Sequence, residues 1–147
     1  MSERVDIGFT SIHIFMHDYW HPAPETEDTM SIFSYFYTNQ AEKFAYYRIP
    51  KTLFSDERFS ALSTESKVLY GLMLDRMGLS RKNGLIDDLD RVYIYFTLDE
   101  VMECFHCAKE KANKLIAELD ARGIGLIESK RQGLGKANII YVKDFSS

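Results

Sequence analysis

The feature that most constrains the fold is a pair of amphipathic patterns separated by a short turn. The first pattern covers Leu98–Phe105 and follows a suitable N-cap, Thr97. The second covers residues 108–122, has a clean stripe of apolar side chains and ends at Gly123. Two apolar faces this close in the chain must share one core. The sequence therefore predicts a helix-turn-helix unit, with its turn at residues 104–107.

The segment after this unit predicts a two-stranded β-hairpin. Residues 126–131 and 137–142 are strand-like, and Gly133 and Gly135 between them permit positive φ. The run from Ser129 to Lys143 contains basic residues and no acidic residue. We therefore expect a hairpin with a positively charged tip.

The region upstream predicts one long helix and two further strands. Ser63 is a suitable N-cap, the residues behind it have helical periodicity, and Gly78 is a potential stop. Residues 44–49 and 92–96 are rich in β-branched and aromatic side chains, which predicts strands. The other signals are a short helix over residues 50–54 and turns at Asn83, Gly84 and residues 87–90.

This order of elements is typical of a winged helix-turn-helix. The expected fold class is α+β and mainly helical: a winged helix-turn-helix with a two-stranded wing and an N-terminal extension. We expect the domain to cover residues 44–147. Residues 1–43 form the expected extension or arm, where Pro22 and Pro24 interrupt any regular element.

The composition limits the kind of partner. The chain has 147 residues and a net charge of −4, with the acidity concentrated in residues 1–46, so it is not a polybasic coat protein. DNA contact would need a local cationic patch. No apolar run reaches about 18 residues, which excludes a membrane-spanning helix. Two cysteines and no export signal favour reduced thiols in a cytoplasmic protein.

An aromatic group around the start of the domain has two interpretations. It forms either ordinary core or a homodimer interface, where Tyr and Phe are enriched. A dimer would raise DNA affinity by linking two half-sites. The group comprises Phe33, Tyr35, Phe36, Tyr37, Phe44, Tyr46 and Tyr47.

The second helix of the unit carries the candidate DNA-reading face. At 100° per residue, Glu110, Asn113 and Lys114 lie opposite the apolar stripe, with Lys111 to one side and Lys109 nearer the stripe. Lysine contacts phosphate or guanine, and asparagine pairs with adenine. The glutamate either accepts from cytosine or pairs with the lysine four residues later.

The hairpin carries the second candidate contact. Lys130, Arg131, Gln132 and Lys136 would reach a flanking phosphate or the minor groove. Each charge alone is equally expected on an ordinary solvated surface. A protein-docking winged helix or a winged-helix transcriptional regulator would show the same arrangement, so both stay as alternatives.

Several motifs in register resemble the replication initiator protein A family of Gram-positive plasmids and mobile elements. The resemblance covers about residues 44–145 and does not visibly include residues 1–43. The motifs are YYRIPK (46–51), LYGLMLDRM (69–77), KNGLID (82–87), RVYIY (91–95), GLIESKRQGLGK (125–136) and IYVKDF (140–145). One departure is Asp90, where glycine is expected.

The resemblance implies a function. Such initiators bind repeated sequences (iterons) in double-stranded origin DNA through an N-terminal winged-helix domain, commonly as dimers. A separate C-terminal domain recruits host replication factors. This chain stops just after the wing, so we expect it to be the DNA-binding part alone. The family's DNA-contacting regions fall on Lys109, Lys111, Asn113 and Lys114, and on Lys130, Arg131 and Lys136.

Other residue clusters give weak support to metal binding or catalysis. Zinc needs four ligands, and no second pair accompanies Cys104 and Cys107; we expect Cys104 to pack inside and Cys107 and His106 to occupy the turn. Clustered aspartates in a turn favour local backbone bonding. We expect no enzyme, no cofactor and no metal. The remaining candidates are His13, His17 and His21, and Asp87, Asp88 and Asp90.

Overall fold

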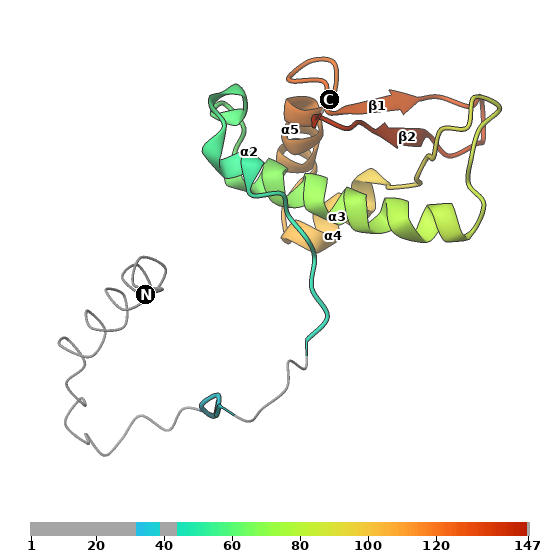
Figure 1. The fold of residues 1–147 in the computed structure, drawn as a ribbon. Helices are drawn as coiled ribbons and strands as arrows, with labels where there is room; N and C mark the ends of the chain where they lie inside the picture. Colours follow the sequence, from blue (N-terminus) through green and yellow to red (C-terminus); the bar gives the residue numbers. More distant parts are fainter. Residues whose placement is uncertain (1–31, 39–43, 147) are drawn as a thin grey trace, which may run out of the picture. The chain divides into compact units, whose positions relative to one another are not determined.

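The computed structural model describes residues 32–38 and 44–146 (Figure 1). The chain divides into two units, Met1–Lys43 and Phe44–Ser147. In the first unit, the described segment 32–38 has neither helix nor strand, and its side chains are exposed. The prediction of an arm over residues 1–43 concerns mainly residues outside the described ranges and stays a prediction.

The second unit contains the described helices and strands. A short helix, a tight turn, a longer helix and an antiparallel hairpin follow one another, so the predicted winged helix-turn-helix is confirmed. No helix in the described part of the chain is both long and apolar enough to cross a membrane. The order is α2 (Thr52–Ser55), the 3₁₀ helix η1 (Glu57–Phe59), α3 (Thr64–Lys82), α4 (Leu98–Phe105), α5 (Lys109–Leu119), β1 (Ile127–Lys130) and β2 (Ile139–Val142).

Helix α3 runs further than the sequence predicts, because Gly78 does not end it. A Cβ at Gly78 would meet nothing within 4 Å, and the helix continues through this open position. The helix ends at Asn83, whose N–H donates to the Leu79 carbonyl at 3.0 Å, and Gly84 then takes a φ of 72°. The residue that can turn the chain is therefore the second glycine, not the first.

The core lies between α3, the helix-turn-helix and the hairpin. Helix α3 buries Leu69, Tyr70 and Met73 on one face, and Val101 of α4 is fully buried. The hydroxyl of Tyr70 donates to the carbonyl of Lys143 at 2.7 Å, which satisfies its polar end. The predicted helical stripes thus meet in one common core.

The two wing strands are shorter than predicted, and one residue pair outside them extends the sheet beyond β2. Ile127 pairs with Val142 at one end of the ladder, and Lys130 pairs with Ile139 at the other. On the other edge of β2, Ile94 and Ile140 exchange N–H···O bonds of 2.8 and 2.9 Å. The predicted strand over residues 92–96 therefore contributes isolated bridges in place of a full ladder.

The predicted strand over residues 44–49 does not form. Residues 44–50 are neither helix nor strand, and the sheet in the described part of the chain consists of β1 and β2. Ile49 packs instead against α3, where a Cβ added to Gly71 would lie 2.7 Å from the Ile49 Cγ1 atom. Because Gly71 has no side chain, the segment around Ile49 can pack directly against α3.

Helix α5 is shorter at both ends than the predicted range 108–122. Ala108 is an exposed N-cap without a side-chain hydrogen bond, although the sequence placed it inside the helix. The helix ends at Asp120, whose carboxylate accepts from the Arg122 N–H at 2.9 Å and draws the chain into a turn. A Cβ on Gly123 would lie 2.3 Å from the Glu118 carbonyl oxygen. Glycine is therefore needed here because the chain passes close to the backbone of α5, and it is not the residue at which the helix ends.

Candidate nucleic-acid interface

Local hydrogen bonds fix the start of the helix-turn-helix. Thr97 and Glu100 form a reciprocal capping box: the Glu100 N–H donates to the Thr97 Oγ1 atom at 3.1 Å, and the Thr97 N–H donates to the Glu100 carboxylate at 2.7 Å. Arg76 of α3 binds the same carboxylate at 3.0 Å, which anchors α4 to the long helix. Burial alone raises the pKa of Glu100, but the bonds from Thr97 and Arg76 outweigh it and lower the value.

The turn between the helices depends on one residue in left-handed conformation. His106 has φ 48° and ψ 47°, and the following Cys107 N–H donates to the Met102 carbonyl at 3.1 Å. Cys107 packs against the core, whereas Cys104 is exposed. The prediction that Cys104 packs inside is therefore wrong, whereas Cys107 lies in the turn between α4 and α5, as predicted, and contacts the core from there.

Helix α5 presents the predicted polar face to solvent. Ala112, Leu115 and Leu119 are buried on the opposite side. The buried and exposed positions alternate at helical spacing, so the face is determined by the sequence period. The exposed polar side chains are those of Lys109, Glu110, Lys111, Asn113 and Lys114.

Lys111 differs from its neighbours because it has an acidic partner in another helix. Its Nζ atom lies 2.6 Å from a carboxylate oxygen of Glu65, in the first turn of α3. The hydrogen bond to Glu65 raises the pKa of Lys111. A phosphate at Lys111 would have to compete with this carboxylate, which the sequence spacing did not reveal.

The wing presents its predicted cations at the end of β1 and on the exposed loop that follows it. Lys130, Arg131, Gln132 and Lys136 are all exposed. Gly133 and Gly135 adopt φ of 120° and 75°, as the sequence predicts. Between them Leu134 is completely exposed. Lys143, which the sequence included in the cationic run, lies 3.3 Å from the carboxylate of Glu128 on the neighbouring strand.

The loop after α3 contains a hydrogen-bonded centre around Asp87, whose local backbone bonds the sequence predicted and whose bond to the wing it did not. The Asp87 carboxylate accepts from the Leu89 N–H at 3.0 Å and from the Arg91 N–H at 2.9 Å. Its other oxygen accepts from Arg91 Nε at 2.9 Å and from the hydroxyl of Tyr141 on β2 at 2.8 Å. Asp90 adopts a φ of 62°, the left-handed region in which the resemblance led us to expect glycine.

These contacts shift the ionisation of the centre. Burial alone raises the pKa of Asp87, but hydrogen bonds from Arg91, Tyr141 and Leu89 outweigh it and hold the pKa well below its usual range. The bond to Asp87 raises the pKa of Arg91 and that of Tyr141. The loop is therefore tied to the wing by a carboxylate that stays ionised.

This centre and the wing enclose a common groove. A groove of about 570 Å³ is lined by Arg91, Tyr93 and Tyr141 together with wing residues. Figure 1 shows the wing loop beside the loop that follows α3. The structure thus brings together four predicted contact residues, Lys130, Arg131, Gln132 and Lys136, in a groove to which α5 contributes no lining residue.

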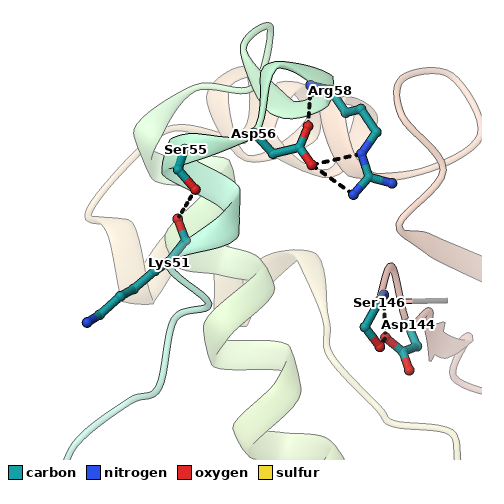
Figure 2. A network of polar contacts seen from close by, with 6 residues as sticks. All are labelled: Lys51, Ser55, Asp56, Arg58, Asp144 and Ser146. Atoms are coloured by element: carbon teal, nitrogen blue, oxygen red, sulfur yellow. Dashed lines mark hydrogen bonds and ion pairs between the residues drawn. The ribbon is translucent and has the colours of Figure 1, made fainter.

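A second polar network stabilises the short helices of the same unit. Figure 2 shows Asp56 binding the N–H and the guanidinium of Arg58, with an Nη2 to carboxylate distance of 2.9 Å. The same figure shows Ser55 donating to the Lys51 carbonyl. Hydrogen bonds from Arg58 lower the pKa of Asp56. These contacts close local turns and include no residue of the candidate interface.

The other clusters named in the sequence take different positions. Within residues 32–38 and 44–146, no group of three or more His, Cys, Asp or Glu side chains is suited to a metal ion. His13, His17 and His21 lie outside the described residues. Phe44, Tyr46 and Tyr47 are exposed, so the core interpretation is wrong for these three members of the aromatic group. The dimer interpretation stays a prediction.

The family model described as the N-terminus of replication initiator protein A matches residues 45–147. The chain belongs to this family. The match begins within one residue of the start of the second unit and confirms the resemblance carried by the sequence motifs. A curated relative, the 41 kDa protein of Lactobacillus helveticus, is 31% identical over 93 residues. That alignment covers 63% of this chain and 26% of the relative, so the chain spans about a quarter of that protein.

Solved structures with a similar fold include a DNA binding protein, a Rep-DNA complex and an initiator. The structure titled as a Rep-DNA complex is 34% identical with a TM-score of 0.61, over 76% of this chain and 84% of the other. The N-terminal domain of a DNA binding protein is 33% identical with a TM-score of 0.59, over 71% and 85%. The MDR initiator is 27% identical with a TM-score of 0.59, over 76% and 86%.

Proposed function

We propose that this replication initiator domain binds double-stranded DNA sequence-specifically at repeats (iterons) of a replication origin. The observation that carries the proposal is the exposed face of α5, where Asn113 and Lys114 stand opposite the buried Ala112 and Leu115. A helix with this division can enter the major groove while its apolar side stays in the core. The similarity to a structure titled as a Rep-DNA complex supports the same interpretation.

The two cationic groups would have different tasks. Asn113 and Lys114, with Glu110, are suited to read base edges, because amides and ammonium groups discriminate bases in the major groove. Lys109 and the wing residues Lys130, Arg131 and Lys136 are suited to bind phosphates, which position the protein and supply most of the affinity. Lys111 would bind DNA only after its ion pair with Glu65 breaks.

Binding as a homodimer would link two half-sites and increase the affinity for repeated DNA. The exposed aromatic side chains Tyr35 and Tyr47 are candidates for this contact, because tyrosine is enriched at protein interfaces. Sedimentation of the chain with and without one repeat tests this part of the proposal. A complex with one protomer per repeat would contradict it.

The main experiment identifies the DNA directly. The chain selects ligands from a pool of random duplexes, and the enriched sequence is compared with the origin of the parent replicon. Mobility shifts on that sequence and on a scrambled duplex, at two salt concentrations, then separate specific from electrostatic binding. Enriched sites in a promoter would favour a transcriptional regulator. Failure to enrich any sequence would overturn DNA reading and favour protein docking.

A further inference from the structure

The groove between the wing and the loop after α3 has an excess of positive charge. It contains four basic side chains and two carboxylates, and one of these carboxylates is paired inside the groove wall. The charged lining residues are Arg91, Lys130, Arg131, Lys136, Asp87 and Asp88. A groove of this charge favours an anion, and the basic residues come from both of its walls.

Arg91 is held in position by contacts on two sides. Its Nε atom donates to Asp87 at 2.9 Å, its Nη2 atom lies 2.8 Å from the same oxygen, and its guanidinium lies 4.6 Å from the centre of the Tyr141 ring. The bonds to Asp87 use the Nε and Nη2 atoms of Arg91, and the side chain is 50% exposed. A guanidinium held in this way keeps donors available for a second anion.

Asp87 leaves no free acceptor oxygen to compete with an incoming ligand, although its charge offsets one of the four positive charges. Its carboxylate already accepts bonds from Leu89, Arg91 and Tyr141, so its acceptor positions are filled from within the protein. The carboxylate orients Arg91, and the groove keeps more positive than negative charge. The three wing cations have no such partner within the described part of the chain, and they stay free to meet an anion.

We propose that this groove binds a backbone phosphate of duplex DNA outside the bases read by α5, with Arg91 as an additional phosphate-binding residue. The proposal rests on the proposed function. A guanidinium matches the fork of phosphate oxygens, which favours this anion. The cations are exposed on two loops and at the end of β1 and are not gathered in an enclosed pocket, which favours a polymer over a small free anion.

The test compares two duplexes that carry the same selected repeat. One ends at the repeat, and the other has about ten further base pairs, one helical turn, on each side. Wild-type chain should bind the longer duplex more tightly, and hydroxyl-radical cleavage should reveal protected sugars in the added segment. A third ligand with single-stranded extensions should show no such gain.

The decisive variant is Arg91→Gln. It should remove the gain from the added base pairs and reduce the slope of log K against log salt by about one unit on the longer duplex. A merely structural role for Arg91 would leave that slope unchanged. Arg91→Lys should keep the slope, because it keeps the charge, but bind less tightly, because it lacks the planar fork.

Arg58→Gln is the matched control. Arg58 pairs with Asp56, as Figure 2 shows. Its guanidinium lies 5.2 Å from the centre of the Phe59 ring, and it does not line the groove. It should keep both the gain and the salt slope. If Arg91→Gln is unfolded at the assay temperature, hydroxyl-radical protection of the added base pairs by the wild-type chain tests the groove proposal instead.

The outcomes separate the two proposals. Absence of preference for the repeat over a scrambled duplex overturns the proposed function itself. Preference for the repeat, with no gain or protection from the added base pairs, overturns the groove proposal alone. So does an unchanged slope with folded Arg91→Gln. A larger gain from single-stranded than from duplex extensions would show that the groove takes a single strand instead.

Discussion

The carboxylate of Glu118 in α5 accepts two hydrogen bonds from Ser63, the N-cap of α3: one from the N–H at 3.0 Å and one from the hydroxyl at 2.8 Å. The same hydroxyl oxygen accepts from the Ser66 N–H at 3.2 Å. One carboxylate therefore links the end of the helix proposed to read DNA to the start of the longest helix. The negative charge is also favourable at the N-terminus of α3.

Replacing Glu118 by alanine should destabilise the domain by about 1–3 kcal/mol, because a partly buried N–H and hydroxyl would lose a charged acceptor. Urea unfolding monitored by circular dichroism measures the change. The control is Glu103→Ala, at an exposed position of α4, which should cost less than about 0.5 kcal/mol. Equal losses in the two variants would contradict a special role of the link.

Replacing Asn113 by alanine should weaken binding to the cognate repeat by about 1–3 kcal/mol and change binding to random duplex little. Asparagine reads base edges, and its removal leaves phosphate contacts intact. Lys130→Ala is the contrasting variant and should weaken both duplexes, with a salt slope lower by about one unit. Titration by fluorescence anisotropy measures both. Equal losses on all sequences for Asn113→Ala would contradict base reading.

Replacing Glu65 by glutamine should increase DNA affinity, because it releases Lys111 from its ion pair. The pair is about half exposed, so we expect a change in stability below about 1 kcal/mol. Asp75→Asn removes the same charge from α3 without freeing Lys111 and is the control. Lys111→Ala in the Glu65→Gln background should abolish the gain. A gain of equal size with Asp75→Asn would indicate a general charge effect.

The loop after α3 should lose stability in acid. The folded-state pKa of Asp87 is lowered, so its contribution is present above the pKa of an unfolded aspartate, about 3.9, and is lost as the pH falls toward the folded value. Asp87→Asn should flatten the acid limb of the stability curve, measured by urea unfolding from pH 7 to pH 3. Asp88→Asn, at the exposed neighbouring position, should leave that limb in place.

Replacing Asp90 by glycine should stabilise the domain by up to about 1 kcal/mol. Asp90 has a φ of 62°, a region that costs energy for residues with a Cβ and not for glycine. Thermal unfolding measures the effect. Asp88→Gly is the control, because Asp88 has no positive φ, and glycine there should be neutral or destabilising. Destabilisation by Asp90→Gly would show that the aspartate side chain itself is needed.

Much of the fold could be predicted because its signals are local. Thr97 and Glu100 are three residues apart, and their reciprocal bonds depend only on that spacing. The exposed position of Asn113 and Lys114 follows from the helical period. The errors arose where local signals compete. Gly78 and Gly84 are both potential stops for α3, and only packing and backbone conformation distinguish them.

The sequence by itself determined the helix-turn-helix, the cationic hairpin and the polar face of α5, because periodicity, capping and turn chemistry act over a few residues. Only the tertiary structure decided that Lys111 meets Glu65, that Glu118 binds Ser63, and that Tyr141 joins Asp87. Each of these contacts joins side chains far apart in the chain. Such pairs form only after the core has brought their helices and strands together.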